Sequence, residues 1–478
     1  LLLVGCEALL STGDVTRGAE LVAALEALDG DDRLEAWTTC FRSQLVTLTE
    51  PDALDRAGAD AESAAALLET LGDKAGVAKA RLVRAGALAR LGRIGDCEAE
   101  LDLALTAARA ADDRRNITAV LGAAPVAALW GPSPVARAGG RCLDVLRLLR
   151  ITSASPAVEA TSIRCQAVLE ALRGRYDSAR TMLATARGIC EENGIRQGLL
   201  ETAFYAGLVE LSAGDAVAAE GHLRGAYDQM GQLGLGADAG QAAAHLARSL
   251  LRQDRVDEAD EMARVGERLA GSNPQTGIVA RAVRAEVLSA QGRHDDAIRL
   301  ADEAVAVASV TDILVDHANA LQALARVQEA AGHEDAARSA ADSADAICDA
   351  KGASGLTRAA AAPEVSEPDG LALNSSDVAG VTDRDTVPDN RAASTHRNLD
   401  ALMLAGDIDA IASMHAADAR LIDHRSMTGI NLAGPDEMLA SLGQVMRGLE
   451  RYEVRTLATR GDRIFLSERI AHYAVGTV

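Results

Sequence analysis

A turn residue, most often glycine, returns about every forty residues through residues 1–352, each time after an apolar, alanine-rich segment. Successive turn residues are between 38 and 43 positions apart. A period of this length is typical of a repeat protein, in which every repeat is one small structural unit. The nine turn residues, which we call anchors, are Gly13, Asp52, Gly92, Gly131, Gly174, Gly214, Asp254, Gly292 and Gly332.

Small residues occupy fixed places around every anchor. The residue five positions after each anchor is glycine, alanine or cysteine, and seven positions before each anchor only Leu45 is larger than cysteine. Two antiparallel helices joined by a short turn approach closely only where side chains are small, and a glycine in the turn supplies the left-handed conformation that ends the first helix. Each repeat is therefore predicted to be a helical hairpin, and the hairpins to stack into a solenoid with a concave surface. Anchors Asp52 and Gly131 fit the pattern least well, so irregular hairpins are expected there.

The composition also favours helices. The chain of 478 residues has only 2 Trp, 5 Tyr and 3 Phe, so most apolar side chains are small, which suits closely packed helices better than sheets. The predicted fold class is mostly α, with a smaller α+β region at the carboxyl end.

The spacing of the small positions across the glycine turn resembles that of tetratricopeptide repeats over residues 1–352, with about nine repeats, a longer period and no proline at the repeat end. The variety that ends in "GHEDAARSAADSADAICDAKGASG" is similar to the helical tail that follows the ATPase module in LuxR-type and antibiotic-regulatory transcription factors and in multidomain adenylate or guanylate cyclases. This resemblance implies a sensor or docking arm of a bacterial signalling protein.

A different composition begins after Gly352. Residues 353–393 are rich in Pro, Ser, Gly and Asp, which predicts a flexible acidic linker. In residues 394–478, "ARLIDHR" is expected to form a strand, "PDEMLASLGQVMRGL" a helix, and "YEVRTLATRGDRIFLSERIAHYAV" a hairpin that turns at Gly461 and Asp462. The order resembles the SnoaL-like branch of the NTF2-like fold. The chain stops before the last strands of that fold and starts at Leu1, so we expect an excerpt of a longer protein.

Polar residues of this second region are candidates for chemistry, because relatives of the NTF2-like fold point acids, bases or ligand contacts into a cone-shaped cavity. The candidate catalytic residues are Asp423, His424 and His472, and the candidate ligand-binding residues are Tyr452 and His415. A catalytic role needs burial in an apolar pocket, and placement on the surface is the alternative interpretation.

Other classes of function are disfavoured. Seventy acidic against 48 basic side chains give a net charge of −22, which repels nucleic acid and anionic membranes. The sequence has no phosphate-binding Gly-x-x-x-x-Gly-Lys-Ser/Thr motif, no candidate membrane span, and seven dispersed cysteines without metal-site spacing, so we expect a cytoplasmic protein without a cofactor or metal. His294, Asp295 and Asp296 look like a site, but they follow an anchor and are interpreted as the start of a helix.

Two hypotheses follow. The first is a non-catalytic scaffold that docks a protein partner or a neighbouring domain, with the NTF2-like region binding a small ligand or mediating dimerisation. The alternative is an isomerase, cyclase or dehydratase in the NTF2-like region, with the solenoid as recruiter. An inert spacer is a third possibility.

Overall fold

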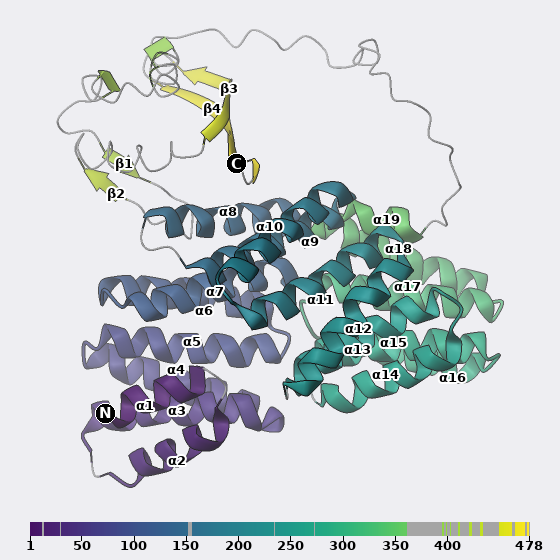
Figure 1. The fold of residues 1–478 in the computed structure, drawn as a ribbon, viewed down its shortest axis with the longest axis horizontal. Helices are drawn as coiled ribbons and strands as arrows, with labels where there is room; N and C mark the ends of the chain where they lie inside the picture. The colour runs from purple at the N-terminus through teal and green to yellow at the C-terminus, as the bar shows by residue number, and fades with distance from the viewer. Residues whose placement is uncertain are drawn as a thin grey trace. The chain divides into compact units, whose positions relative to one another are not determined.

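The computed structural model describes residues 1–11, 14–28, 30–151, 155–233, 235–271 and 273–360, together with short stretches between 394 and 477. The chain divides into two compact units, one of residues 1–145 and 155–361 and one of residues 146–154 and 362–478. The first unit is the helical solenoid, and Figure 1 shows its helices lying against one another in chain order.

The solenoid consists of helical hairpins, which confirms the predicted fold class for this part of the chain. Each anchor that the structure describes lies in or beside the turn between the two helices of a pair. The pairs are α1 (Leu2–Ser11) and α2 (Val15–Glu26); α3 (Asp32–Thr49) and α4 (Leu54–Thr70); α5 (Lys74–Arg90) and α6 (Ile94–Ala110); α7 (Arg114–Trp130) and α8 (Val135–Ile151); α9 (Pro156–Leu172) and α10 (Tyr176–Glu192); α11 (Arg196–Ala213) and α12 (Ala216–Gln232); α13 (Gly236–Leu251) and α14 (Val256–Ala270); α15 (Pro274–Ala290) and α16 (His294–Ser309); and α17 (Leu314–Ala330) and α18 (Glu334–Lys351).

The anchors end the first helix of a hairpin by the predicted mechanism. Left-handed backbone with φ between 76° and 84° occurs at five glycine anchors, and Asp254 has φ 58°. The five glycines are Gly92, Gly174, Gly214, Gly292 and Gly332.

The two anchors that fit the sequence pattern least well are irregular in the structure. Asp52 lies in a short 3-10 helix, η1 (Pro51–Ala53), and Gly131 is extended, with φ −78° and ψ −171°. Both sites adjoin a proline, and a residue before proline is driven towards extended backbone, as Gly131 is before Pro132.

Most of the small positions five residues after an anchor are buried. Ala179, Ala219, Ala259 and Ala297 all have 0% exposure. After the irregular turn at Gly131 the contact position moves by two residues, from the exposed Ala136 to the buried Ala138.

The helix predicted after the eighth anchor is also present. Helix α16 begins at His294, with Asp295 and Asp296 in its first turn, and His294 is half-buried. Asp296 forms ion pairs with Arg293 and Arg299, so its carboxylate stabilises the start of the helix.

The helical unit extends beyond residue 352, although the composition predicts a linker from residue 353 onwards. A further helix, α19 (Ser354–Ala360), follows α18, and its Leu356 is 8% exposed. Gly355 lies so close to the hairpin of α9 and α10 that an added Cβ would be 2.7 Å from the Gly174 nitrogen. The rest of the predicted linker, residues 361–393, lies outside the described residues.

Distant hairpins of the solenoid also meet each other. Asp312, between α16 and α17, accepts hydrogen bonds from the backbone N–H groups of Ile94 and Gly95, both at 2.6 Å, and its own N–H donates to the Gly92 carbonyl at 3.1 Å. Lys351, at the end of α18, donates to the carbonyl oxygens of Gly131 at 2.5 Å and Ser133 at 2.8 Å. We call this contact of Asp312 and Lys351 with the two turns at Gly92 and Gly131 the seam. It joins the last hairpin to the third and fourth, so the row of hairpins closes on itself.

The second unit contains strands. Strand β1 (Arg420–Ile422) pairs antiparallel with β2 (Asn431–Ala433), β3 (Leu449–Arg460) with β4 (Ile464–Tyr473), and β4 with β5 (Gly476–Thr477). The turn predicted at Gly461 and Asp462 falls between β3 and β4 in the sequence, on residues outside the described ones. Most of residues 394–448 lie outside the described residues, so the NTF2-like fold stays a prediction.

Candidate functional site

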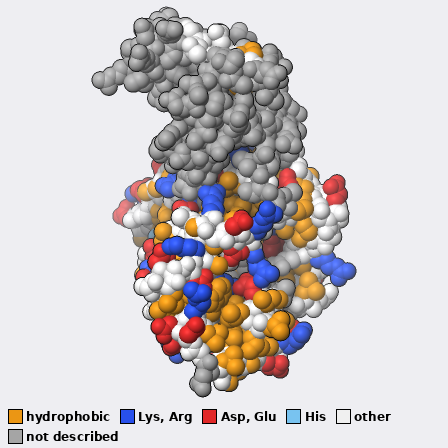
Figure 2. Space-filling model, turned by 90° about the vertical axis from the view of Figure 1, so that its left-hand side faces the viewer, with side chains coloured by type: hydrophobic (Ala, Val, Ile, Leu, Met, Phe, Trp, Pro, Cys, Tyr) orange, Lys and Arg blue, Asp and Glu red, His pale blue; other side chains and the backbone are white. Residues whose placement is uncertain are grey.

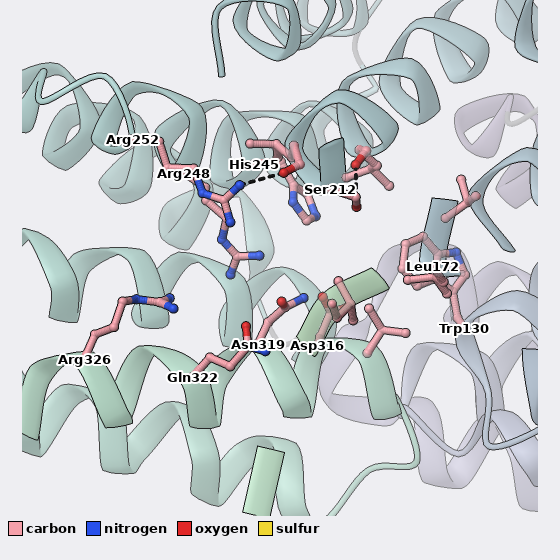
Figure 3. A pocket seen from close by; sticks show the side chains of 15 residues that line it. Trp130, Leu172, Ser212, His245, Arg248, Arg252, Asp316, Asn319, Gln322 and Arg326 are labelled. Atoms are coloured by element: carbon pink, nitrogen blue, oxygen red, sulfur yellow. Dashed lines mark hydrogen bonds between the residues drawn. The ribbon is translucent and has the colours of Figure 1, made fainter. Parts of the chain in front are cut away.

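A pocket lies at the centre of the solenoid, between the first helices of several hairpins and α19. It contains about 670 Å³ of space outside the atoms, part of it open to solvent. Figure 3 shows Trp130 and Leu172 at one end and three arginines at the other. The lining residues come from α7, α9, α11, α13, α17 and α19 and the turn after α13: Trp130, Val168, Leu172, Leu208, Leu211, Ser212, His245, Arg248, Arg252, Val315, Asp316, Asn319, Gln322, Arg326 and Leu356.

The three arginines of the pocket differ in their partners. Arg326 holds Glu286 of α15 through two hydrogen bonds of 3.1 and 2.8 Å. Arg252 donates to the Leu211 carbonyl oxygen at 2.6 Å. Arg248 is only 9% exposed, and no ion pair or hydrogen bond to another described residue holds its guanidinium group. Two of the three arginines therefore lack a carboxylate partner among the described residues.

Burial and mutual repulsion act on these cations. Burial lowers the pKa of Arg252 to about 10, and the positive charges of Arg248 and Arg326 add to this effect. Burial also lowers the pKa of Arg248, although Glu286 and Asp316 oppose it. Arg252 still carries its charge at neutral pH. A bound anion would relieve the cost of keeping such charges away from water.

His245 is a second unsatisfied group in the pocket. It is 3% exposed, and neither ring nitrogen has a hydrogen-bond partner. Its ring meets the Phe204 ring edge-on, with 5.6 Å between the centroids. Burial, and then the charge of Arg248, lower its pKa to about 3, so the ring is neutral at pH 7. A neutral imidazole has one donor and one acceptor, and both are unused here.

An acidic side chain lies opposite the arginines. Asp316 is 1% exposed and accepts a hydrogen bond from Gln275 Nε2 at 2.9 Å. Burial raises its pKa, and the charge of Arg248 counteracts that effect. With three arginines and one aspartate in its lining, the pocket is locally positive in a chain whose net charge is −22. On the face of the molecule in Figure 2, by contrast, acidic and basic side chains are interspersed. The lining of this pocket therefore attracts an anionic group.

The residues predicted as sites in the second unit are only partly described. Tyr452 lies on β3 and pairs with Ala471, and His472 lies on β4 and pairs with Arg451. Asp423, His424 and His415 lie outside the described residues. The catalytic and ligand-binding roles of these five residues stay predictions.

The pocket residues were missed at the level of sequence, although the repeat pattern contains a signal for them. The position six residues before an anchor faces the pocket in several hairpins, and it changes from apolar to charged along the chain. Residues at this position are Val168, Leu208, Arg248, Glu286 and Arg326. The position two residues before an anchor also lines the pocket and also changes from apolar to charged, with Leu172, Ser212 and Arg252.

Other kinds of site find no support in the part of the chain that the structure describes. There, no group of three or more His, Cys, Asp or Glu side chains could hold a metal ion. Within the same residues, no helix is long and apolar enough to span a bilayer. The seven cysteines are free and buried.

A comparison with one solved structure supports the fold. No protein-family model matches the chain, and no curated protein does. A solved Rap protein, complexed with Competence and Sporulation Factor, has 13% sequence identity and a TM-score of 0.55, with 73% of this chain and 97% of that chain covered. The Rap conjugation gene regulator of the plasmid pLS20, in complex with the Phr* peptide, has 12% identity and a TM-score of 0.48, covering 73% of this chain and 96% of its own.

A third solved structure is a Signal Transduction ATPase with Numerous Domains that carries a tetratricopeptide repeat sensor, from Pyrococcus horikoshii. It has 13% identity and a TM-score of 0.40, and the match covers 71% of this chain and 54% of that chain. Because the identities are so low, the likeness to the Rap protein establishes the fold alone, which is a tetratricopeptide-like solenoid.

Proposed function

We propose that the solenoid is a non-catalytic sensor or docking scaffold, and that its pocket binds a carboxylate-bearing segment of a peptide or protein partner. The observation that carries this proposal is Arg248, which is buried to 9% exposure and forms no ion pair or hydrogen bond with a described carboxylate. A buried cation without a partner is costly, and a guanidinium group binds a carboxylate through two parallel hydrogen bonds.

The two ends of the pocket favour a peptide over a simple ion. Trp130 and Leu172 offer an apolar surface, while Arg248 and Arg252 offer charge a short way along the same hollow (Figure 3). A peptide that carries an apolar side chain beside a carboxylate would fill both ends. The Rap protein with the similar fold is itself complexed with Competence and Sporulation Factor, which supports binding by a solenoid of this kind.

The pocket offers little for catalysis. Ser212 donates its hydroxyl to the Leu208 carbonyl oxygen at 2.9 Å, so this hydroxyl is already engaged. His245 is neutral and packed against Phe204. Binding is therefore the function that these contacts support best.

The test uses a library of random short peptides with free carboxyl ends, presented to the whole chain. Peptides selected by the chain should lose at least about tenfold in affinity, measured by calorimetry, when Arg248 and Arg252 are both replaced by Gln, because a charged hydrogen bond contributes roughly 1.5–3 kcal/mol. Arg299→Gln is the matched control, since Arg299 is 65% exposed and lies on α16. Unchanged affinity in the Arg248 and Arg252 double variant would refute the proposal.

The wider context is proposed from resemblance. We place the solenoid in a multidomain bacterial signalling or transcription-regulatory protein of the ATPase or cyclase type, in a reducing compartment such as the cytoplasm. All seven cysteines are buried free thiols, which supports a reducing compartment.

The long hairpin of β3 and β4 supports a second proposal, an α+β module of the SnoaL-like type in residues 394–478 that binds a small ligand. Its catalytic alternative is an isomerase, cyclase or dehydratase that uses Asp423, His424 or His472. A crystal structure of the whole chain tests it: if all three side chains face solvent instead of a closed apolar cavity, the enzymatic alternative is wrong.

A further inference from the structure

Residues of the seam adjoin residues that line the pocket. Trp130 lines the pocket, and the carbonyl of the next residue, Gly131, accepts a hydrogen bond from Lys351. Asp312 lies just before α17, the helix that carries Asp316 and Arg326 into the pocket. The seam therefore holds both walls of the pocket, α7 on one side and α17 on the other.

Helix α19 also connects the seam with the pocket. This helix starts three residues after Lys351 and places Leu356 in the pocket. Lys351 is 1% exposed and reaches the oxygens of Gly131 and Ser133, with Ala128 O at 3.5 Å. If Lys351 left these carbonyls, the chain would lose an attachment just before α19, a helix that also packs against α9 and α11.

The helix start at the seam differs from others in the solenoid. Helices α5, α7 and α12 are capped by an aspartate of their own turn, namely Asp73, Asp113 and Asp215. Helix α6 has no cap from its own turn, because Arg93 stands at that position, and an arginine also precedes α10, α14 and α16. Its N–H groups are instead satisfied by Asp312, which is 218 residues away from Ile94. The cap of α6 exists only when the distant hairpins are together.

We propose that the seam is a clasp that opens and closes, and that the pocket is complete only when the clasp is closed. In the open state α17 and the end of α18 separate from α7, and Asp316 and Arg326 no longer face Trp130. A ligand that touches both walls stabilises the closed state, and closing of the clasp raises the affinity for that ligand by the same factor. The clasp concerns the formation of the pocket and does not depend on which ligand fills it.

Trp130 is a built-in reporter of this motion. The chain has 2 tryptophans, Trp37 and Trp130, so Trp37→Phe leaves the pocket tryptophan as the sole one. Trp130 is 8% exposed in the closed state. Quenching of its fluorescence by acrylamide, measured on the whole chain in this background, reports how open the pocket is.

Asp312→Ala and Lys351→Met are expected to raise the quenching constant of Trp130 several-fold while the helical circular dichroism is kept. Asp215→Ala, which removes a local cap from α12, is the matched control and should leave the quenching constant unchanged. Folded Asp312→Ala and Lys351→Met variants with the parent's quenching constant would overturn the proposal.

Hydrogen exchange on the unmodified chain tests whether the seam opens, even if these variants fail to fold. The amides of Ile94 and Gly95, which Asp312 caps across the seam, should exchange several-fold faster than the amide of Ala218, which Asp215 caps locally at 2.9 Å. Equal or slower exchange at Ile94 and Gly95 would show that the seam does not open and would overturn the clasp.

Discussion

Two buried basic side chains of the solenoid have opposite surroundings. Lys351 in the seam is 1% exposed and donates to backbone carbonyls of a distant turn, whereas Arg248 in the pocket is 9% exposed and has no partner among the described residues. A buried polar group that is satisfied stabilises a fold, and one that is not satisfied costs free energy. The difference indicates that Lys351 stabilises the fold, whereas Arg248 is available to bind a ligand.

The largest effect should come from the satisfied cation. Lys351→Met leaves the carbonyls of Gly131 and Ser133 without their donor, and we expect the free energy of unfolding to fall by about 2–3 kcal/mol. Urea denaturation of the whole chain measures it, with Arg299→Gln on exposed α16 as the control. A change as small as the control's would mean that Lys351 contributes nothing to the fold.

The same substitution at the unsatisfied cation should have the opposite sign. Arg248→Met removes a buried charge that forms no ion pair with a described carboxylate, so the free energy of unfolding should rise by about 1–2 kcal/mol. The same urea titration measures it. If Arg248→Met instead destabilises the chain as Lys351→Met does, the contrast between the two cations is wrong.

The neutral histidine of the pocket should make stability depend on pH. Because the pKa of His245 is lowered from 6.5 to about 3 in the fold, only the unfolded chain binds this proton between those values. Stability should therefore fall as the pH drops below 6.5, by at most about 1.4 kcal/mol per pH unit. Thermal unfolding of the parent and of His245→Leu between pH 4 and pH 7 isolates this contribution, since the other acidic and basic groups titrate in both. If the stability of the parent and that of His245→Leu depend on pH in the same way, His245 does not contribute to the pH dependence.

The smallest effect should come from a simple anion in the pocket. Millimolar sulfate should raise the melting temperature of the parent by about 1 °C more than that of the Arg248→Gln, Arg252→Gln double variant, because the anion binds only the folded pocket. Sodium chloride at matched ionic strength separates this gain from general screening. An equal gain in parent and double variant would place the sulfate effect elsewhere.

The hairpins could be predicted from the sequence because their requirements are local. A left-handed residue such as Gly214 ends one helix, and a small residue such as Ala219 lets the next helix approach. The irregular turn at Gly131 was also foreseeable, since Pro132 follows it.

The seam and the pocket could not be predicted in the same way. The meeting of Asp312 with Ile94 depends on the accumulated rotation of several hairpins, and each small rotation is set by packing details that a period does not contain. The charges of Arg248 and Arg326 are visible in the sequence, at equal distance from their anchors. Which helix face turns towards the hollow of the solenoid is visible only in the structure.

The distance along the chain between α6 and its cap has a consequence for synthesis. At roughly 5–20 residues per second, a ribosome needs roughly 11–44 s to advance the 218 residues from Ile94 to Asp312. During that time the nascent hairpin of α5 and α6 keeps its first amides in water. The order of translation thus delays completion of this hairpin until almost the whole solenoid has left the ribosome.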